Sequence, residues 1–338
     1  RERHPVPRYP DCPHCGPAKR GPTAERHRIR IAQDGAIGAA DAGWRSLTPE
    51  EAFARLDAIV SPLTGIVSGL RPLPLPEGLH VYVAAQAAAA PPDPRENRVL
   101  GKPGGASGKG LTDIQARISC LAEAVERYAA QWVGSDETRI ASWRELKDCA
   151  PHPQSLLGFS ARQYAERESR NALSGRMNRI PEPFRPDVAI EWCPAWSLTQ
   201  DKERWLPARC CYFDYRNAMV AQDHAFCLAD SNGCASGGTL EEAMFQGLLE
   251  LVERDAIAIW WYNRLKVPAI DPAGLDDAFM ARVNGYFDAK GRNVHLLDLT
   301  TDLGIPVVAA LAADAGGARV MIGMGAHLDG RIAALRAI

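Results

Sequence analysis

The chain has 338 residues, of which 46% are hydrophobic and 24% charged, and its formal net charge is −2 at pH 7. A chain of this size can bury a large core, and its near-neutral charge indicates neither a nucleic-acid partner nor a membrane surface. No apolar run approaches the roughly 18 residues of a transmembrane helix, and the first residues do not resemble a signal peptide. Nine cysteines in such a chain favour a reducing cytoplasm.

Residues 1–40 are rich in Arg, Pro and His and lack the pattern of a packed core. Cys12 and Cys15 have the C-x-x-C spacing of half a zinc site. A structural zinc needs four ligands, and the sequence holds no second C-x-x-C pair, so two exposed thiols remain an alternative. We predict that residues 1–40 are a tail and linker and that residues 41–338 form the main domain.

The main domain opens with a helix signal. Thr48 is a cap, Pro49 stands in the first turn, and Glu51 has the capping-box position, which predicts a helix over 52–60. Strands are predicted over 65–70 and 80–86. A glycine-rich run then reaches Gly110 and predicts a flexible loop. Its Lys109 is a candidate phosphate ligand, with a solvated loop lysine as the alternative.

A nine-residue pattern then occurs twice. Ser119-Cys-Leu-Ala-Glu123-Ala-Val-Glu126-Arg127 returns as Gln246-Gly-Leu-Leu-Glu250-Leu-Val-Glu253-Arg254, and a run of small residues precedes each copy. Two copies of a loop and a helix indicate an internal duplication and a pseudo-symmetric helix pair. We predict these helices over 112–132 and 240–263.

Helical geometry places the polar residues of each copy in one stripe, roughly 80° wide. The stripe residues are Gln115, Ser119, Glu123 and Glu126 on the first helix and Glu242, Gln246, Glu250 and Glu253 on the second, with Arg127 and Arg254 at the edges. The second helix is otherwise apolar, which predicts burial, and buried carboxylates need cations. Mg²⁺ takes oxygen ligands and bridges carboxylates to phosphates, which arginines also bind. The alternative is a solvated face with local Glu–Arg pairs.

The remaining elements complete an α+β fold with antiparallel sheets packed on helices and two related halves around a central nucleotide site. Short helices are predicted over 142–147 and 161–167. Strands are predicted over 191–198, 204–206, 209–215, 294–299, 305–311 and 319–324, and a final helix begins near 331. The first residue is Arg and the last residues form part of this helix, so we interpret the chain as part of a longer protein.

The two acidic helices carry a resemblance, together with Asp230-Ser-Asn-Gly-Cys-Ala-Ser-Gly-Gly before the second helix and Glu253-Arg-Asp-Ala-Ile-Ala-Ile-Trp-Trp-Tyr-Asn-Arg at its end. Over residues 40–338 the chain resembles the YcaO family, and within it the SagD-like cyclodehydratases of thiazole/oxazole-modified peptide and bacteriocin biosynthesis. The resemblance implies ATP and Mg²⁺ as cofactors. It implies that their ligands are Ser119, Glu123, Glu126, Arg127, Glu242, Gln246, Glu250, Glu253 and Arg254. Gly238 departs from relatives that carry Asn there.

The family's third motif is Arg-x-x-x-Glu, and Arg336 fits its first position, whereas the Glu would be residue 340. The Pro-rich C-terminus that such enzymes use in catalysis is not in this sequence, so no catalytic residue is predicted. Residues 1–20 resemble the end of an E1-like domain whose zinc also uses an upstream Cys pair.

The resemblance implies ATP-dependent cyclodehydration: Cys, Ser or Thr of a ribosomally made precursor peptide becomes an azoline after phosphorylation of a backbone amide oxygen. The implied partners are that peptide and a leader-binding E1-like protein or domain, while a flavin dehydrogenase and a homodimer stay open. Alternatives are thioamide formation with sulfide, an accessory role in methylthiolation, and a non-catalytic scaffold that docks a leader peptide.

Overall fold

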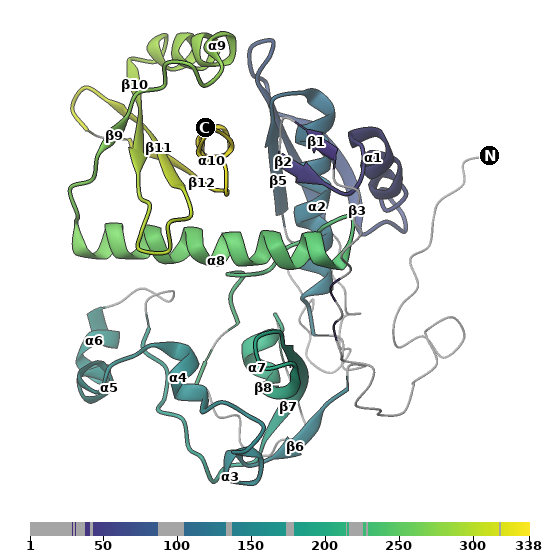
Figure 1. Ribbon diagram of the computed structural model, residues 1–338, viewed down its shortest axis with the longest axis vertical. Helices are drawn as coiled ribbons and strands as arrows, with labels where there is room; N and C mark the ends of the chain where they lie inside the picture. Colours follow the sequence, from purple (N-terminus) through teal and green to yellow (C-terminus); the bar gives the residue numbers. More distant parts are fainter. Residues whose placement is uncertain are drawn as a thin grey trace.

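The computed structural model describes residues 29, 31, 38–40, 43–86, 105–132, 137–173, 179–213, 215, 226–227, 229–317 and 319–338. The zinc half-site predicted at Cys12 and Cys15 therefore lies outside the described residues. Within them the strands form antiparallel sheets packed on helices, which confirms the predicted α+β class. Four parts of the chain build this fold: an N-terminal hairpin, an N-terminal layer, a lower lobe and a C-terminal layer (Figure 1).

The hairpin and the N-terminal layer precede residue 130. Their elements are β1 (Gly38–Ala40), β2 (Gly43–Arg45), α1 (Pro49–Asp57), β3 (Val67–Pro72), β4 (His80–Gln86), β5 (Gly105–Gly110) and α2 (Asp113–Ala129). The predicted capping box of Thr48 and Glu51 is present at the start of α1. The three strands form a sheet in the order β3-β4-β5, and α2 packs on it around Leu121.

The predicted flexible loop before α2 is wrong, because its last residues form strand β5. Glycine explains this strand: a Cβ on Gly108 would lie 2.0 Å from the backbone nitrogen of Cys120. The glycines thus let the backbones of β5 and α2 meet directly, at a separation that a side chain would prevent.

The lower lobe holds a second three-stranded sheet. Its elements are β6 (Arg139–Ala141), α3 (Trp143–Leu146), α4 (Pro153–Leu157), α5 (Ala161–Ala165), α6 (Arg167–Leu173), β7 (Ile190–Ser197), β8 (Lys202–Pro207) and α7 (Ala208–Cys211). The strand predicted over 209–215 is wrong, since its first residues form the short helix α7. Trp192 and Phe226 fill the core of this lobe. The lobe joins the end of α2 through a hydrogen bond from the Trp132 backbone to the Phe213 carbonyl.

The C-terminal layer contains α8 (Leu240–Asn263), β9 (Ala269–Ile270), α9 (Asp277–Asp288), β10 (Arg292–Asp298), β11 (Val307–Asp314), β12 (Met321–Ala326) and α10 (Gly330–Ala337). Its four strands follow the order β12-β11-β10-β9. Helix α10 lies against β12, and Gly323 and Gly325 permit this approach. A Cβ at either position would lie within 2.3 Å of an α10 carbonyl oxygen. Helix α10 lies above α8, between the C-terminal sheet and the N-terminal layer with β5 and α2 (Figure 1).

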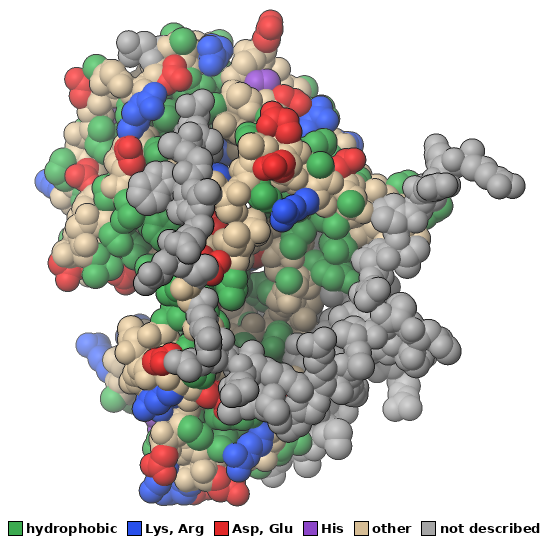
Figure 2. All heavy atoms as spheres, turned by 45° about the vertical axis from the view of Figure 1, so that its right-hand side comes forward, with side chains coloured by type: hydrophobic (Ala, Val, Ile, Leu, Met, Phe, Trp, Pro, Cys, Tyr) green, Lys and Arg blue, Asp and Glu red, His purple; other side chains and the backbone are tan. Residues whose placement is uncertain are grey.

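Helix α8 runs along the underside of the C-terminal layer and crosses α2 near its own start (Figure 1). The sequence predicts burial on nearly all sides, and the structure corrects this. Leu249, Val252 and Ala256 are buried, whereas Trp261 and Tyr262 are 60% and 77% exposed. On the face shown in Figure 2, hydrophobic side chains are visible where the lower lobe meets the rest of the molecule. No helix in the described part of the chain combines the length and apolarity needed to cross a bilayer.

Candidate functional site

The two copies of the repeated pattern begin with the same local structure. Thr112 caps α2 and Thr239 caps α8, each through its side-chain oxygen. One turn further on, Gln115 accepts a hydrogen bond from the backbone nitrogen of Leu111 at 3.1 Å, and Glu242 accepts one from Gly238 at 3.3 Å. These bonds satisfy backbone donors that a helix leaves unpaired at its start. The duplication predicted from sequence is thus a duplication of three-dimensional structure.

The first glutamate of each pattern also has matching partners. Glu123 accepts a hydrogen bond from the backbone nitrogen of Ser107 at 3.0 Å, and Glu250 accepts one from Gly233 at 3.1 Å. Each carboxylate also pairs with the arginine one turn later, Glu123 with Arg127 at 3.4 Å and Glu250 with Arg254 at 3.3 Å. The local Glu–Arg pairs of the alternative interpretation therefore exist. The backbone contacts show that these carboxylates also hold the preceding segments in place.

The second glutamates, Glu126 and Glu253, are less exposed, at 15% and 14% of the side-chain area. Burial raises the pKa of the Glu126 carboxyl to about 7; Arg127 lowers it, and the negative charges of Glu250 and Glu123 raise it further. Burial likewise raises the pKa of Glu253, against the charge of Arg254. Carboxylates whose ionised form is disfavoured gain most when a cation binds beside them.

A small-residue segment, residues 233–238, lies between α2 and α8. Ser236 donates a hydrogen bond to the Ala122 carbonyl of α2 at 3.0 Å. Gly247 of α8 faces this segment at close range, since a Cβ there would lie 2.6 Å from the Gly233 carbonyl oxygen. The segment is thus held by both helices of the pair.

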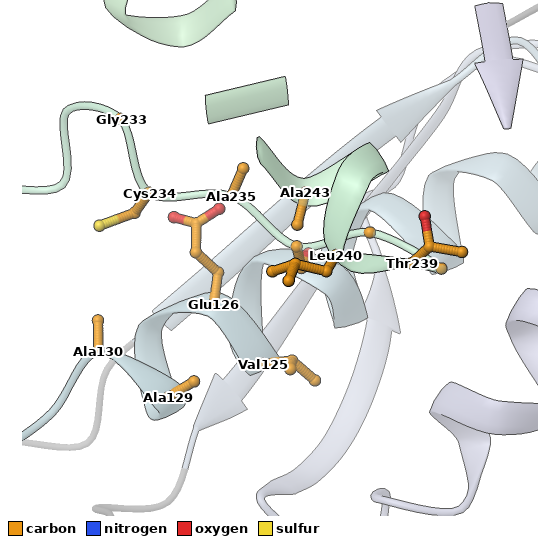
Figure 3. Close-up of a pocket in the computed structure, with 13 residues that line it drawn as sticks. Val125, Glu126, Ala129, Ala130, Gly233, Cys234, Ala235, Thr239, Leu240 and Ala243 are labelled. Atoms are coloured by element: carbon orange, nitrogen blue, oxygen red, sulfur yellow. The ribbon is translucent and has the colours of Figure 1, made fainter. Parts of the chain in front are cut away.

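A hollow of about 640 Å³ opens between this segment and α2. In Figure 3 the Glu126 carboxylate points from α2 toward Cys234 and Ala235 of the segment. Most of the other lining residues are Gly, Ala, Ser or Thr. Of the predicted nucleotide and magnesium ligands, which all belong to the described part of the chain, Glu126 alone lines this hollow.

The cationic side chains gather on the α10 side of α8. Arg336 donates to the Gln246 Oε1 atom at 3.1 Å and to the Ala326 carbonyl at 3.2 Å. Lys109 donates to the Ala337 carbonyl at 3.1 Å, so it is not the solvated loop lysine of the alternative. Burial lowers the pKa of Lys109 to about 8, against the opposing effect of Glu253. Burial also lowers the pKa of Arg336 to about 10, as does the charge of Arg45, while Glu253 raises it.

Sequence reasoning missed Arg45, which ends the N-terminal hairpin. Its guanidinium lies 3.3 Å from Glu242, and the Ser46 backbone and hydroxyl donate to the same carboxylate at 3.0 and 2.6 Å. Burial alone would raise the pKa of Glu242, but the hydrogen bonds from Ser46 and the charge of Arg45 bring it below its usual value. No spacing in the sequence links Arg45 to α8, so only the fold reveals it.

The amide nitrogen of Gln246 is a buried donor without a hydrogen-bond partner among the described residues. It lies beside Arg336, whose pKa Arg45 also influences. A buried donor without a partner costs about 1 to 3 kcal/mol, and two like charges repel each other. An anion would relieve both effects. The residues present therefore fit a bound phosphate group.

Most of the predicted residues thus fall into two connected groups, which α2, α8, β5 and α10 contribute. Glu123, Glu126, Glu250 and Glu253 form a carboxylate group, and Lys109, Gln246 and Arg336 form a cationic group with Arg45. Glu242 contacts the hairpin instead, and Ser119 is exposed on α2. In the described part of the chain, no three His, Cys, Asp or Glu side chains could hold a metal by themselves. This fits Mg²⁺, which usually takes one or two carboxylates and completes its shell with phosphates and water.

Comparison with known proteins places this site in a family. A family model described as "YcaO cyclodehydratase, ATP- and Mg²⁺-binding" matches residues 107–338, which include both acidic helices and α10. The chain belongs to the YcaO family.

Two curated relatives extend the comparison. An uncharacterized protein of Methanothermobacter thermautotrophicus is 34% identical over 236 residues, covering 69% of this chain and 55% of the relative. An uncharacterized protein in the tfuA 3′ region of Rhizobium leguminosarum bv. trifolii is 29% identical over 314 residues, covering 89% of this chain and 66% of the relative. The chain thus spans between half and two thirds of the length of these relatives.

The chain is also similar to solved structures of heterocyclases and of a YcaO protein. A heterocyclase in complex with substrate and cofactor is 38% identical, with a TM-score of 0.83 over 96% of this chain and 43% of that one. The heterocyclase TruD is 32% identical, with a TM-score of 0.68 over 99% of this chain and 40% of TruD. The YcaO protein of Methanopyrus kandleri, bound with AMPPCP and Mg²⁺, shares the fold at 22% identity and a TM-score of 0.61.

Proposed function

We propose that this chain is the ATP-using domain of a peptide cyclodehydratase, which forms azolines at Cys, Ser or Thr residues of a ribosomally made precursor peptide. The observation that carries the proposal is the cationic group beside α8. Arg45 pairs with Glu242 of α8, and Arg336 donates to Gln246 one turn further along that helix. The Gln246 amide nitrogen has no partner among the described residues, and Lys109 donates to the carbonyl of Ala337, next to Arg336. Such a group suits the phosphates of a nucleotide.

The carboxylate group supplies the metal side of the proposed site. One or two carboxylates of the group Glu123, Glu126, Glu250 and Glu253 would hold each Mg²⁺ ion, and the raised pKa of Glu126 and of Glu253 means that a bound cation would stabilise their ionised forms. Arg127 and Arg254 pair with these carboxylates and would keep them oriented. Bound MgATP would supply the phosphoryl group. The chain's own residues would bind and orient the nucleotide and neutralise the charge of its phosphates.

The proposed reaction joins a side chain to the backbone. A thiol or hydroxyl attacks the preceding amide carbon, and phosphorylation of the amide oxygen turns that oxygen into a good leaving group. Elimination of phosphate then leaves the azoline ring. We do not assign the glutamates as general bases, because their contacts are with backbone donors and arginines.

The partners belong to the same proposal. One similar solved structure, a heterocyclase in complex with substrate and cofactor, supports a precursor peptide as substrate. A leader-binding E1-like domain, zinc at Cys12 and Cys15, a flavin dehydrogenase and a homodimer remain predictions from the sequence resemblance. We infer that residues 41–338 are the YcaO domain and that residues 1–40 connect it to the E1-like part.

Calorimetric titration of ATP, with and without Mg²⁺, tests the nucleotide site. We expect Mg²⁺-dependent binding, weakened about 10- to 100-fold in Arg336→Ala because charged hydrogen bonds to a phosphate are lost. Arg319→Ala is the matched control, since Arg319 is an exposed arginine that pairs with Asp314 on the same sheet. Equal binding by both variants would contradict the assignment of Arg336.

A second experiment separates the reaction from mere binding. Phosphate release by the chain, supplied with its E1-like partner, is measured with a Cys-rich precursor peptide and with sulfide. Peptide-dependent release with loss of one water mass per ring supports cyclodehydration, whereas sulfide-dependent release supports thioamide formation. Peptide binding without ATP consumption by the unmutated chain would favour the docking scaffold.

A further inference from the structure

Two cysteines outside the nucleotide site lie in contact within the lower lobe. The Sγ atoms of Cys210, at the end of α7, and Cys227 are 2.7 Å apart. This separation exceeds the roughly 2.05 Å of a disulfide bond by less than 1 Å. Both cysteines are thiols in this structure. The fold has therefore already brought two sulfur atoms, 17 positions apart in sequence, almost to bonding distance.

Core packing and a hydrogen bond keep these two thiols next to each other. Cys227 is 2% exposed and belongs to the core cluster of the lobe, against which Cys210 packs. Arg209, the residue before Cys210, donates a hydrogen bond to the Cys227 carbonyl at 3.3 Å. The Arg209 side chain thus ties the Cys227 backbone to α7, so forming a bond between the sulfurs needs little movement.

The neighbouring thiols Cys211 and Cys193 pair with each other and not with Cys210 or Cys227. Cys211 receives a hydrogen bond from Cys193, which lowers the pKa of Cys211. Although five cysteines of the lobe, including Cys149, belong to the described residues, no three of them are arranged to hold a metal. Simple core packing of two small side chains is the remaining alternative for Cys210 and Cys227.

We propose that Cys210 and Cys227 are a disulfide-forming pair that is oxidised by a small-molecule disulfide such as glutathione disulfide. The Cys210 thiolate attacks one sulfur of glutathione disulfide and releases one glutathione. Cys227 then attacks the Cys210 sulfur of the mixed disulfide and releases the second. Two protein thiols become one disulfide, one glutathione disulfide becomes two glutathione molecules, and the two protein protons go to them.

The position of the bond gives it a consequence. Cys227 stands shortly before Gly233, whose backbone nitrogen holds Glu250, and before the segment that lies between α2 and α8. A bond from Cys227 to α7 would fix the chain where it enters this segment. The hydrogen bond to Cys227, and then burial, raise the pKa of Cys210, so exchange is slow and requires sustained oxidation.

Peptide mapping tests the proposal without reference to the nucleotide site. The purified chain is held overnight at pH 8 in glutathione disulfide, its remaining thiols are alkylated, and trypsin is added. Cleavage after Arg209 and Arg216 yields peptide 210–216, with Cys210 and Cys211, and peptide 217–254, with Cys227 and Cys234. We expect these two peptides to appear linked, and to separate when dithiothreitol is added before digestion.

Four serine variants identify the linked residues. Cys210→Ser and Cys227→Ser should abolish the linked peptide, whereas Cys211→Ser and Cys234→Ser should retain it. Circular dichroism melting confirms that each variant is folded. Absence of the link in the folded wild-type chain, or its survival in Cys210→Ser, would overturn the proposal.

Discussion

Helices α2 and α8 carry the same pattern and make the same local contacts, but the rest of the chain gives them different surroundings. On α2, the Gln115 side chain accepts a hydrogen bond from the backbone nitrogen of Leu111. On α8, the corresponding Glu242 binds Ser46, Arg45 and Gly238. Ser119 is exposed, whereas its counterpart Gln246 binds Arg336.

This difference teaches how a duplicated element acquires two roles. The contacts within each copy, from carboxylate to backbone and from carboxylate to arginine, follow from the sequence pattern and remain equal. The contacts that differ come from the hairpin and from α10, segments far from the helices in sequence. Helix α8 therefore contacts Arg45 and Arg336 of the cationic group through Glu242 and Gln246. Helix α2 contributes carboxylates and lines the hollow.

The largest expected effect tests the first position of each stripe. Glu242→Ala leaves Arg45 and the Ser46 backbone without their carboxylate, and should lower the free energy of unfolding by about 3 to 4 kcal/mol. Gln115→Ala loses one neutral hydrogen bond and should cost about 1 kcal/mol. Urea unfolding of both variants measures the difference. Equal losses would show that the hairpin contributes nothing at this position.

The second prediction concerns pH and the buried glutamates. The pKa of Glu126 rises from 4.5 to about 7 in the folded chain, so folding favours its protonated form. Its contribution to stability is full below pH 4.5 and is lost as pH rises from 4.5 through 7, by about 3 kcal/mol. Glu126→Gln should therefore gain stability over wild type across this range in urea unfolding. Glu253→Gln should change in the same direction, and a pH-independent difference would contradict both.

The third prediction concerns the residue just before each capping threonine, which is Leu111 before α2 and Gly238 before α8. A Cβ on Gly238 would lie 2.3 Å from the Ser46 hydroxyl, so Gly238→Ala should destabilise by about 1 to 2 kcal/mol. Gly285→Ala in α9 is the control, because its Cβ meets nothing within 4 Å and should stabilise the helix by about 0.5 to 1 kcal/mol. Thermal melting compares the two variants. An unchanged melting temperature in Gly238→Ala would show that the hairpin at Ser46 moves aside at little energetic cost.

The smallest effect is expected where the copies are equal. Arg127→Ala and Arg254→Ala each remove a partly exposed pair with a carboxylate one turn away. Each should cost about 0.5 kcal/mol, because solvent and salt screen such pairs. Urea unfolding at low and high salt checks this, and a loss above 2 kcal/mol in one variant alone would show an unequal structural role.

The sequence correctly predicted the helix ends, the strand range and the helix cap that depend on residues close together in the chain. The second acidic helix matches α8 at both ends, and strand β4 matches its predicted range. The cap at Thr48 is also present. These features depend on residues within one or two turns, so the sequence alone was sufficient for them.

The failures arise where distant segments meet. Strand β5 consists largely of glycine, and only its contact with α2 explains why it is a strand and not a loop. Arg45 has no sequence signal because its partner on α8 is 197 positions away. The exposed end of α8, at Trp261 and Tyr262, shows that apolar composition alone does not establish burial.

The hydrogen bond from Lys109 to the Ala337 carbonyl joins positions 228 apart, and the Arg45–Glu242 pair joins the hairpin to α8. On the ribosome these partners emerge at very different times, and long loops must close before they meet. The acidic helices can form early, one after the other. The cationic group is completed only after α10 has emerged, so a nascent chain that ends before α10 holds both carboxylate helices and still lacks Arg336.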